Sequence, residues 1–176
     1  MRIIGGRLKG HKIIAPKSLP VRPTTDFAKE ALFNILNNRI DFPQVSLLDL
    51  FSGTGNISYE FGSRECLEIL AVEQNFQCLK YINKTASDFD LPIHTFKADV
   101  FKFLVKKNHK SYSVVFADPP YQNKNLIDIP DLVFNNEWLA PNGLLIMEHG
   151  PYTSFSDHKN FVELRKYGNV NFSFFE

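Results

Sequence analysis

The spacing of hydrophobic residues divides the chain into an N-terminal arm and a longer, alternating part. In the arm, Ile3-Ile4 and Ile13-Ile14 flank a turn rich in Gly and Lys, which predicts a β-hairpin. An extended linker is then indicated by Pro16, Pro20 and Pro23. Residues 24–26, Thr-Thr-Asp, can cap a helix. The helix itself is predicted by an apolar stripe at helical spacing, which consists of Phe27, Ala31, Leu32, Ile35 and Leu36.

From residue 45 onward, short apolar runs alternate with stretches of helical spacing. Strands are expected over residues 45–51, 68–73, 92–98, 112–118 and 142–150. Helices are expected between them over residues 57–64, 75–89, 99–107 and 126–138, the last with a local break at Pro130. Two strand-like pieces joined by Gly168-Asn169 are predicted to form a closing hairpin.

Alternating strands and helices indicate an α/β fold with a mainly parallel, seven-stranded sheet. Helices are expected on both faces, and the hairpin at the end of the chain adds antiparallel strands. Right-handed crossovers bring the carboxyl ends of the parallel strands to one edge, where ligands bind. The 176 residues are expected to form one domain, with a basic hairpin and linker over 1–23 and a catalytic α/β core over 24–176.

The charges are unevenly distributed along the chain. Residues 1–25 contain no acid but six basic residues, which are Arg2, Arg7, Lys9, Lys12, Lys17 and Arg22. The remainder has 14 basic against 19 acidic residues. A basic arm on an acidic body indicates a polyanion-binding element attached to a different kind of site.

Other classes of site are not favoured by the composition. Cys66 and Cys78 have neither metal-ligand nor disulfide spacing, and the five histidines are scattered, so no metal site is expected. The N-terminal residues contain no long apolar run, which argues against a signal peptide or a membrane span. We therefore expect a protein of the cytoplasm that does not bind membranes, and we also expect a monomer.

The loop after the first predicted strand, "DLFSGTGNIS", has the features of a cofactor loop. Gly53 and Gly55 allow a tight turn and a close approach of the backbone to a ligand, and Ser58 stands where a dinucleotide fingerprint has its third glycine. Glu73 ends the second strand and can accept both ribose hydroxyls of an adenosine. Asp99 ends the third strand and can bind the adenine amine.

These features fit two cofactors, NAD and S-adenosylmethionine. Asp49 lies four residues before Gly53 and directs a carboxylate toward the loop. A carboxylate there repels a pyrophosphate but attracts an ammonium or a sulfonium. The sequence therefore favours S-adenosylmethionine over NAD.

The fourth predicted strand ends in "VFADPPY", on the same edge of the sheet. Asp118 and Pro119 each precede a proline and are therefore held extended. Pro119 and Pro120 have no N–H, so the corner offers only acceptors, the Asp118 carboxylate and backbone carbonyls. Such a corner suits the exocyclic amine of a nucleobase, on which Tyr121 can stack. Two acceptors on the amine hydrogens favour the pyramidal nitrogen that methyl transfer needs.

Four segments together resemble one known family: "MRIIGGRLKGHKI", "RPTTDFAKEALFNIL", "LLDLFSGTG" and "VVFADPPY". This family is the bacterial 16S rRNA (guanine-N2)-methyltransferases of the small subunit, within the class I S-adenosylmethionine-dependent methyltransferases. Their order and spacing are similar, and "LLIMEHG" and "YGNVNFSFFE" extend the resemblance over essentially the whole chain. The first two segments are the specific ones, because the other two are shared by many methyltransferases.

The resemblance implies a Rossmann-like methyltransferase fold and an enzyme that methylates N2 of one guanosine in assembled or partly assembled small subunits. The implied catalytic residues are Asp118, Pro119, Pro120 and Tyr121. The implied cofactor residues are Arg22, Thr24, Asp49, Phe51, Ser52, Gly53, Thr54, Gly55, Glu73, Gln74, Asp99 and Val100. The implied rRNA-binding residues are Arg2, Arg7, Lys9 and Lys12.

The chain departs from the family pattern after Gly55, where Asn56, Ser58 and Tyr59 replace small and aliphatic residues. We expect a retained cofactor loop with altered helix packing.

The Asp-Pro-Pro-Tyr motif alone does not distinguish amines on different bases, so an adenine-N6 methyltransferase acting on RNA or DNA is the alternative. A catalytically idle RNA-binding assembly factor would need a defective cofactor loop or a lost Asp-Pro-Pro-Tyr, and the chain has neither.

Overall fold

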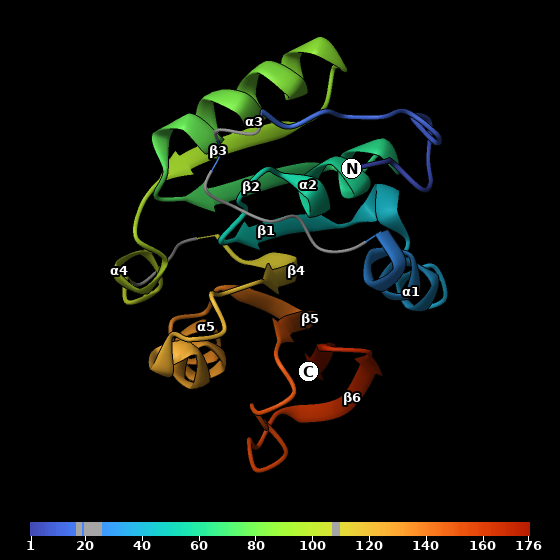
Figure 1. Cartoon of the computed structure of the whole chain (residues 1–176). Helices are drawn as coiled ribbons and strands as arrows, with labels where there is room; N and C mark the ends of the chain where they lie inside the picture. The colour runs from blue at the N-terminus through green and yellow to red at the C-terminus, as the bar shows by residue number, and fades with distance from the viewer. Residues whose placement is uncertain (17–18, 20–25, 107–109) are drawn as a thin grey trace.

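A single seven-stranded sheet organises the molecule (Figure 1). The computed structural model describes residues 1–16, 19, 26–106 and 110–176. The strands lie in the order β3-β2-β1-β4-β5-β7-β6. Their bounds are Ser46–Leu50 (β1), Glu68–Glu73 (β2), Ile93–Lys97 (β3), Tyr112–Ala117 (β4), Leu139–His149 (β5), Phe161–Tyr167 (β6) and Val170–Phe175 (β7). Strands β1 to β5 pair in parallel, and β7 pairs antiparallel with β5 and β6.

The helices cover the two faces of the sheet in groups. One apolar cluster joins α1 (Asp26–Leu36), the short 3-10 turn η1 (Phe42–Gln44), α2 (Asn56–Ser63) and α3 (Phe76–Asp88) to the sheet. A second cluster on the opposite face joins α4 (Val100–Leu104), the 3-10 turn η2 (Lys124–Asp128) and α5 (Ile129–Asn135). In the part of the chain that is described, no helix is both long and apolar enough to cross a membrane.

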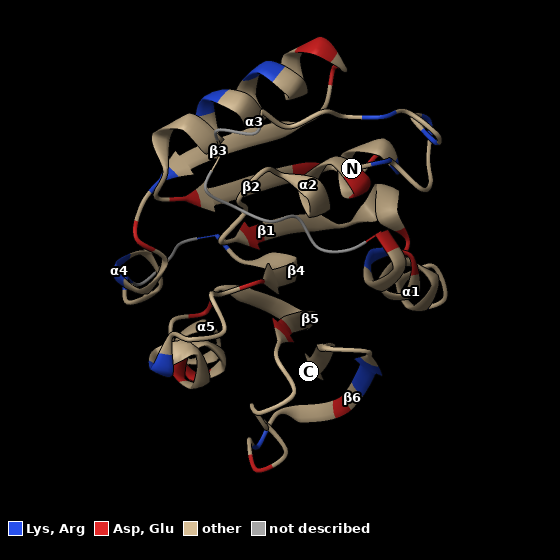
Figure 2. Cartoon of the chain, in the orientation of Figure 1, with Lys and Arg blue, Asp and Glu red and all other residues tan. Residues whose placement is uncertain are grey.

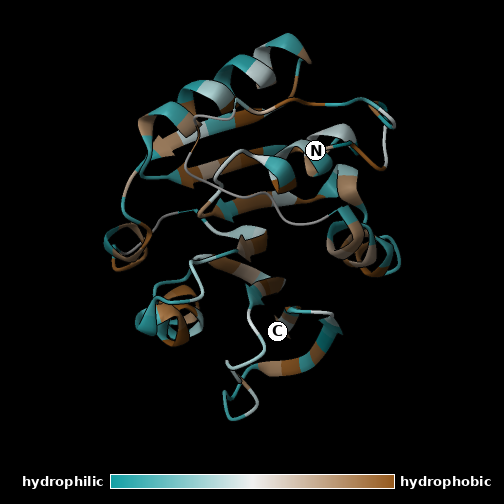
Figure 3. Cartoon of the chain, in the orientation of Figure 1, coloured by the Kyte–Doolittle hydropathy of each residue, from teal (hydrophilic) through white to brown (hydrophobic). Residues whose placement is uncertain are grey.

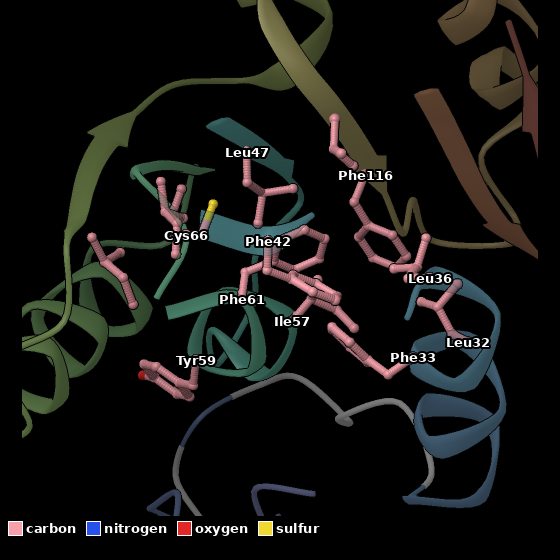
Figure 4. Close-up of a cluster of buried hydrophobic side chains, with 14 of the residues drawn as sticks. Leu32, Phe33, Leu36, Phe42, Leu47, Ile57, Tyr59, Phe61, Cys66 and Phe116 are labelled. Atoms are coloured by element: carbon pink, nitrogen blue, oxygen red, sulfur yellow. The ribbon is translucent and has the colours of Figure 1, made fainter. Parts of the chain in front are cut away.

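Alternation along the strands explains why there are two clusters. Successive side chains of a strand point to opposite faces, so Leu47 joins the first cluster and Leu48 the second. Brown, hydrophobic positions accordingly run along the strands, whereas α3 also has teal, hydrophilic positions (Figure 3). Three aromatic rings from α1, η1 and α2 meet in the first cluster, where Phe33, Phe42 and Phe61 have centroids 5.2–6.0 Å apart (Figure 4).

The predicted alternation of strands and helices is confirmed, with shifts at some element ends. The closing hairpin is also confirmed, and Gly168 in its turn has a φ of 63°. The break predicted at Pro130 is seen as the change from η2 to α5 after Asp128, and Pro130 lies in the first turn of α5, where its missing N–H needs no partner. Strand β5 begins three positions before the predicted start, at Leu139, and helix α4 is shorter than predicted.

The predicted N-terminal β-hairpin is not seen as a pair of strands. An isolated antiparallel bridge joins Arg2 and Lys12, and backbone hydrogen bonds link Ile3 to His11 at 2.9 Å and Ile13 to Met1 at 3.0 Å. The turn between these segments binds the end of α2: Arg7 N–H donates to the Ser63 carbonyl at 2.7 Å, and Leu8 N–H donates to Ser63 Oγ at 3.0 Å. Backbone N–H groups of the turn are therefore satisfied by tertiary contacts.

A buried ion pair also holds the arm. Lys29 of α1 is 1% exposed and lies 2.9 Å from a carboxylate oxygen of Glu60 in α2. The Lys29 ammonium donates to the Arg2 carbonyl at 2.6 Å, and Glu60 accepts from the backbone N–H of Ile4 at 2.8 Å. The two buried charges thus join α1, α2 and the arm, and Asn56, one of the residues that depart from the family pattern, accepts a third Lys29 bond at 2.9 Å.

Candidate active site

A cavity of about 670 Å³ opens at the carboxyl edge of the sheet. Figure 2 shows acidic positions on β1, β2 and β5, three of the strands that reach this edge. The cavity is lined by most of the predicted cofactor and catalytic residues, namely Asp49, Phe51, Ser52, Gly53, Thr54, Glu73, Gln74, Asp99, Val100, Asp118, Pro119, Pro120 and Tyr121. One cavity therefore contacts both the glycine loop and the Asp-Pro-Pro-Tyr corner.

The loop after β1 is built from left-handed backbone conformations. Phe51, Gly53 and Gly55 have φ values of 57°, 53° and 80°. The structure indicates a different role for Gly55 from the expected close approach to a ligand. A Cβ on Gly55 would lie 2.8 Å from the Tyr59 ring and 3.0 Å from Ile82, so this glycine is needed for packing beneath the loop.

Glu73 is held in place by two backbone donors. Its Oε2 accepts from Gly53 N–H at 3.0 Å, and its Oε1 accepts from Asn75 N–H at 2.8 Å. An ionised carboxylate has about four acceptor sites, so two remain for a ligand's hydroxyls. The acid at the end of β2 therefore both braces the glycine loop and presents acceptors to the cavity.

Asp49 is buried in β1 and accepts a hydrogen bond from the hydroxyl of Ser58 in α2. Burial raises its pKa to about 7, with the hydrogen bonds from Ser58 opposing the rise and the charge of Glu73 adding to it. Ser58, which stands in the third-glycine position, thus orients the carboxylate. A cation entering the cavity would favour the ionised form of Asp49.

Asp99 has a structural role as well as its place in the cavity. It caps α4, where its Oδ1 accepts from the backbone N–H of Lys102 at 3.0 Å. The expected bond to an adenine amine would use the acceptor sites that this cap leaves. Asp99 thus caps α4 and also lines the cavity.

The Asp-Pro-Pro-Tyr corner is fixed from both sides. Asp118 N–H lies 3.4 Å from the Leu50 carbonyl, which ties the end of β4 to β1. Tyr121 donates its hydroxyl to Oε1 of Glu148 at 3.0 Å, which ties the corner to β5. Burial, with the charges of Glu148 and Asp49, raises the pKa of Asp118 well above its usual range.

Several lining residues were missed from the sequence: Asn56, Asn75, Asn123 and Glu148. Glu148 lies close to the carboxyl end of a predicted strand, as Glu73 and Asp118 do, so the same reasoning about carboxyl ends could have found it. The asparagines had no such signal. Asn75 and Asn123 cap α3 and η2 with their side chains, a role that many asparagines share.

The remaining predicted residues lie elsewhere. Arg22 and Thr24 fall outside the described residues. The four basic residues predicted to bind rRNA are exposed on the arm. Two of them, Arg2 and Lys9, line a second hollow with Arg64. Arg7 differs, because its guanidinium donates to the carbonyls of Phe89 and Asp90 at 2.7 and 2.5 Å.

Comparison with known proteins places the chain among proteins of similar sequence. The model of the family "Conserved hypothetical protein 95" matches residues 1–176. "Ribosomal RNA small subunit methyltransferase D" of Escherichia coli K12 is 32% identical over 84% of this chain and 74% of its own length. The protein of the same name from Buchnera aphidicola (subspecies Baizongia pistaciae) is 31% identical over 84% of this chain and 75% of its own.

Solved structures are similar in fold. A protein from Escherichia coli, described provisionally as a methyltransferase, matches with a TM-score of 0.86 and 26% identity over 99% of this chain and 96% of its own. A more distant protein, described in the same provisional way and solved with SAH, matches with a TM-score of 0.63 and 17% identity over 75% of this chain and 45% of its own. At that identity the likeness concerns the fold.

Proposed function

We propose that this chain, which belongs to the family of the ribosomal RNA small subunit methyltransferase D proteins, methylates the exocyclic N2 amine of a guanosine in 16S rRNA. The observation on which the proposal mainly depends is that Asp49, Glu73 and Asp118 line one cavity. The first two suit the cofactor, and the third suits the amine that receives the methyl group. Assembled or partly assembled small subunits are the proposed substrate.

The residues of the cavity fit S-adenosylmethionine. Glu73 keeps two acceptor sites for ribose hydroxyls, and Asp49 offers a buried negative charge beside the glycine loop. The same charge would oppose a pyrophosphate, which disfavours NAD. When bound, S-adenosylmethionine supplies an electrophilic methyl group on a positively charged sulfur.

The corner at the end of β4 would position the base. Asp118 accepts one hydrogen of the N2 amine, and the backbone carbonyls of the two prolines offer the second acceptor. As the nitrogen gains a methyl group it loses a proton, and the raised pKa of Asp118 suits a carboxylate that receives it. The ring of Tyr121, 42% exposed, can stack on the base.

The arm would bind rRNA phosphates outside the cavity. Arg2, Lys9 and Lys12 are exposed, and the arm that bears them is docked on α2 through Ser63 and Glu60. Cations on a docked segment can fix the register of the enzyme on a phosphate backbone without reading sequence. The guanosine would leave its stack to reach the cavity.

Transfer of a labelled methyl group tests the proposal. Small subunits from cells that lack this protein should accept label from S-adenosylmethionine, and DNA should not. Asp118→Ala should lower transfer at least about 100-fold while leaving cofactor affinity within about threefold, because the acid serves the amine. Asp128→Ala, at an exposed acid of η2, is the matched control and should keep full activity. Label in DNA alone would refute the rRNA substrate.

A further inference from the structure

We propose that Glu148 reads the N1–H of the target guanine and so distinguishes guanine from adenine. This inference rests on the proposed function, since it concerns how the same cavity chooses its base. It assigns a role to a residue that lies outside the Asp-Pro-Pro-Tyr motif.

The strand pairing places Glu148 next to Asp118. Strands β4 and β5 run parallel with Ala117 opposite Met147, so Asp118 and Glu148 follow at the same level of neighbouring strands. Strand alternation puts Glu148 on the face of Ile146, and Asp118 on the face of Phe116, and both of these residues belong to the first apolar cluster. The two carboxylates therefore lie on one side of the sheet, and both line the cavity.

The neighbours of Glu148 restrict how its carboxylate points. The side chain is 3% exposed, and its Oε1 accepts the Tyr121 hydroxyl at 3.0 Å. The Tyr121 ring in turn packs on Gly150, where an added Cβ would lie 3.0 Å from Cδ2 of the ring. An ionised carboxylate has about four acceptor sites, and the Tyr121 hydroxyl uses one of them.

Guanine and adenine differ in the chemistry of the edge that would face these acids. Guanine has adjacent donors, the N1–H and the N2 amine, which match two neighbouring carboxylates. Adenine has an amine beside a bare N1, whose lone pair would face a carboxylate. Leaving a buried carboxylate opposite a bare acceptor costs far more binding free energy than the loss of an apolar contact. Such a site therefore discriminates strongly between guanine and adenine. If Asp118 accepts a hydrogen bond from the N2 amine, Glu148 is the neighbouring acid that can accept one from N1–H.

The raised pKa of Asp118 agrees with this placement, because the charge of Glu148 is one of its causes. A bound guanine would relieve the repulsion by placing hydrogens between the two groups. The alternative role for Glu148 is to position Tyr121 without contacting the base. In that case its removal would slow transfer to every base by the same factor.

The test uses 2-aminopurine, which has the N2 amine of guanine but lacks the N1–H. Small subunits are reconstituted with guanosine or 2-aminopurine at the nucleotide that the natural protein methylates, and kcat/KM is measured on both. The ratio of the guanosine value to the 2-aminopurine value should fall at least about tenfold in Glu148→Gln, because a neutral amide can also donate to a bare N1. Differences in intrinsic reactivity between the bases cancel when variants are compared.

Tyr121→Phe is the matched variant, since it removes the hydroxyl and keeps the Glu148 charge. It should slow transfer to both substrates and preserve the ratio. If Glu148→Gln does not fold, Glu148→Asp, which withdraws the carboxylate, should lower the ratio in the same direction. An unchanged ratio in the folded Glu148 variant overturns this inference and leaves the methyltransferase proposal intact. Absence of transfer to the guanosine subunits by the natural protein would instead refute the proposed function.

Discussion

The carboxylate of Glu73 accepts a hydrogen bond from the backbone N–H of Gly53 at 3.0 Å. This hydrogen bond ties the glycine loop after β1 to the end of β2. It means that one acid both shapes the loop and faces the proposed ribose position.

Glu73→Gln should weaken binding of S-adenosylmethionine by about 10- to 100-fold. The amide nitrogen would face the N–H of Gly53 or Asn75, so one backbone donor loses its acceptor while the ligand loses a charged one. Titration calorimetry measures the change. Glu30→Gln, on the exposed side of α1, is the control and should bind as the natural protein does. Equal affinities for the two variants would remove Glu73 from the cofactor site.

Asp49→Asn should stabilise the protein most at alkaline pH. Burial raises the folded-state pKa of Asp49 from 3.8 to about 7, so its contribution to stability is fully present below about pH 3.8 and is lost as pH rises toward 7. The advantage of the asparagine should therefore be about 3 kcal/mol larger at pH 8 than at pH 5. Denaturant unfolding at the two pH values measures it. A pH-independent difference would mean that the Asp49 pKa is ordinary.

Gly6→Ala should detach the arm from α2, whereas Gly10→Ala should not. Both glycines have positive φ, 72° and 89°, so both substitutions cost about 1–2 kcal/mol of backbone strain. Only at Gly6 would the new Cβ clash, since it would lie 1.9 Å from the Ser63 carbonyl oxygen. Limited proteolysis within residues 1–15 should be faster in the first variant. Equal cleavage of both would contradict the docked arm.

Replacing Lys9 and Lys12 together by alanine should weaken binding to small subunits about 10-fold and make it less dependent on salt. Each phosphate neutralised by a lysine adds about one to the slope of log affinity against log salt, so the slope should become shallower by about two. The control replaces two exposed lysines of α3, Lys80 and Lys84, a helix on which Figure 2 shows basic positions. If both double variants behave alike, the arm has no special part in rRNA binding.

The order of strands and helices could be predicted because the central strands β1, β2, β4 and β5 each contain a short apolar run between polar segments. Asp49, Glu73 and Asp118 could be placed in one site for a related reason: parallel strands bring their carboxyl ends to one edge. Glu148 obeys the same rule, but it lies one residue before the end of β5, and its segment "LLIMEHG" was used only to extend the resemblance.

The form of the N-terminal arm could not be predicted, because two pairs of isoleucines on either side of a glycine-rich turn suit two paired strands and a docked loop equally well. The choice between them depends on Ser63, Glu60 and Lys29, which are distant in sequence and supply the arm's hydrogen-bond partners. Ile14, 85% exposed, shows that one of the expected strand residues does not pack in the core. Gly55 similarly leaves space for Tyr59 and Ile82 beneath the loop, a role that its spacing from Gly53 did not indicate.

Mass-spectrometric mapping of the methylated nucleotide tests the central claim most directly. Small subunits lacking the modification are incubated with the natural protein and S-adenosylmethionine, and the 16S rRNA is digested to nucleosides and to fragments. We predict N2-methylguanosine at a single position, absent when Asp118→Ala replaces the natural protein. Methylation at N6 of an adenine, or no methylated nucleotide in the rRNA, would contradict the account.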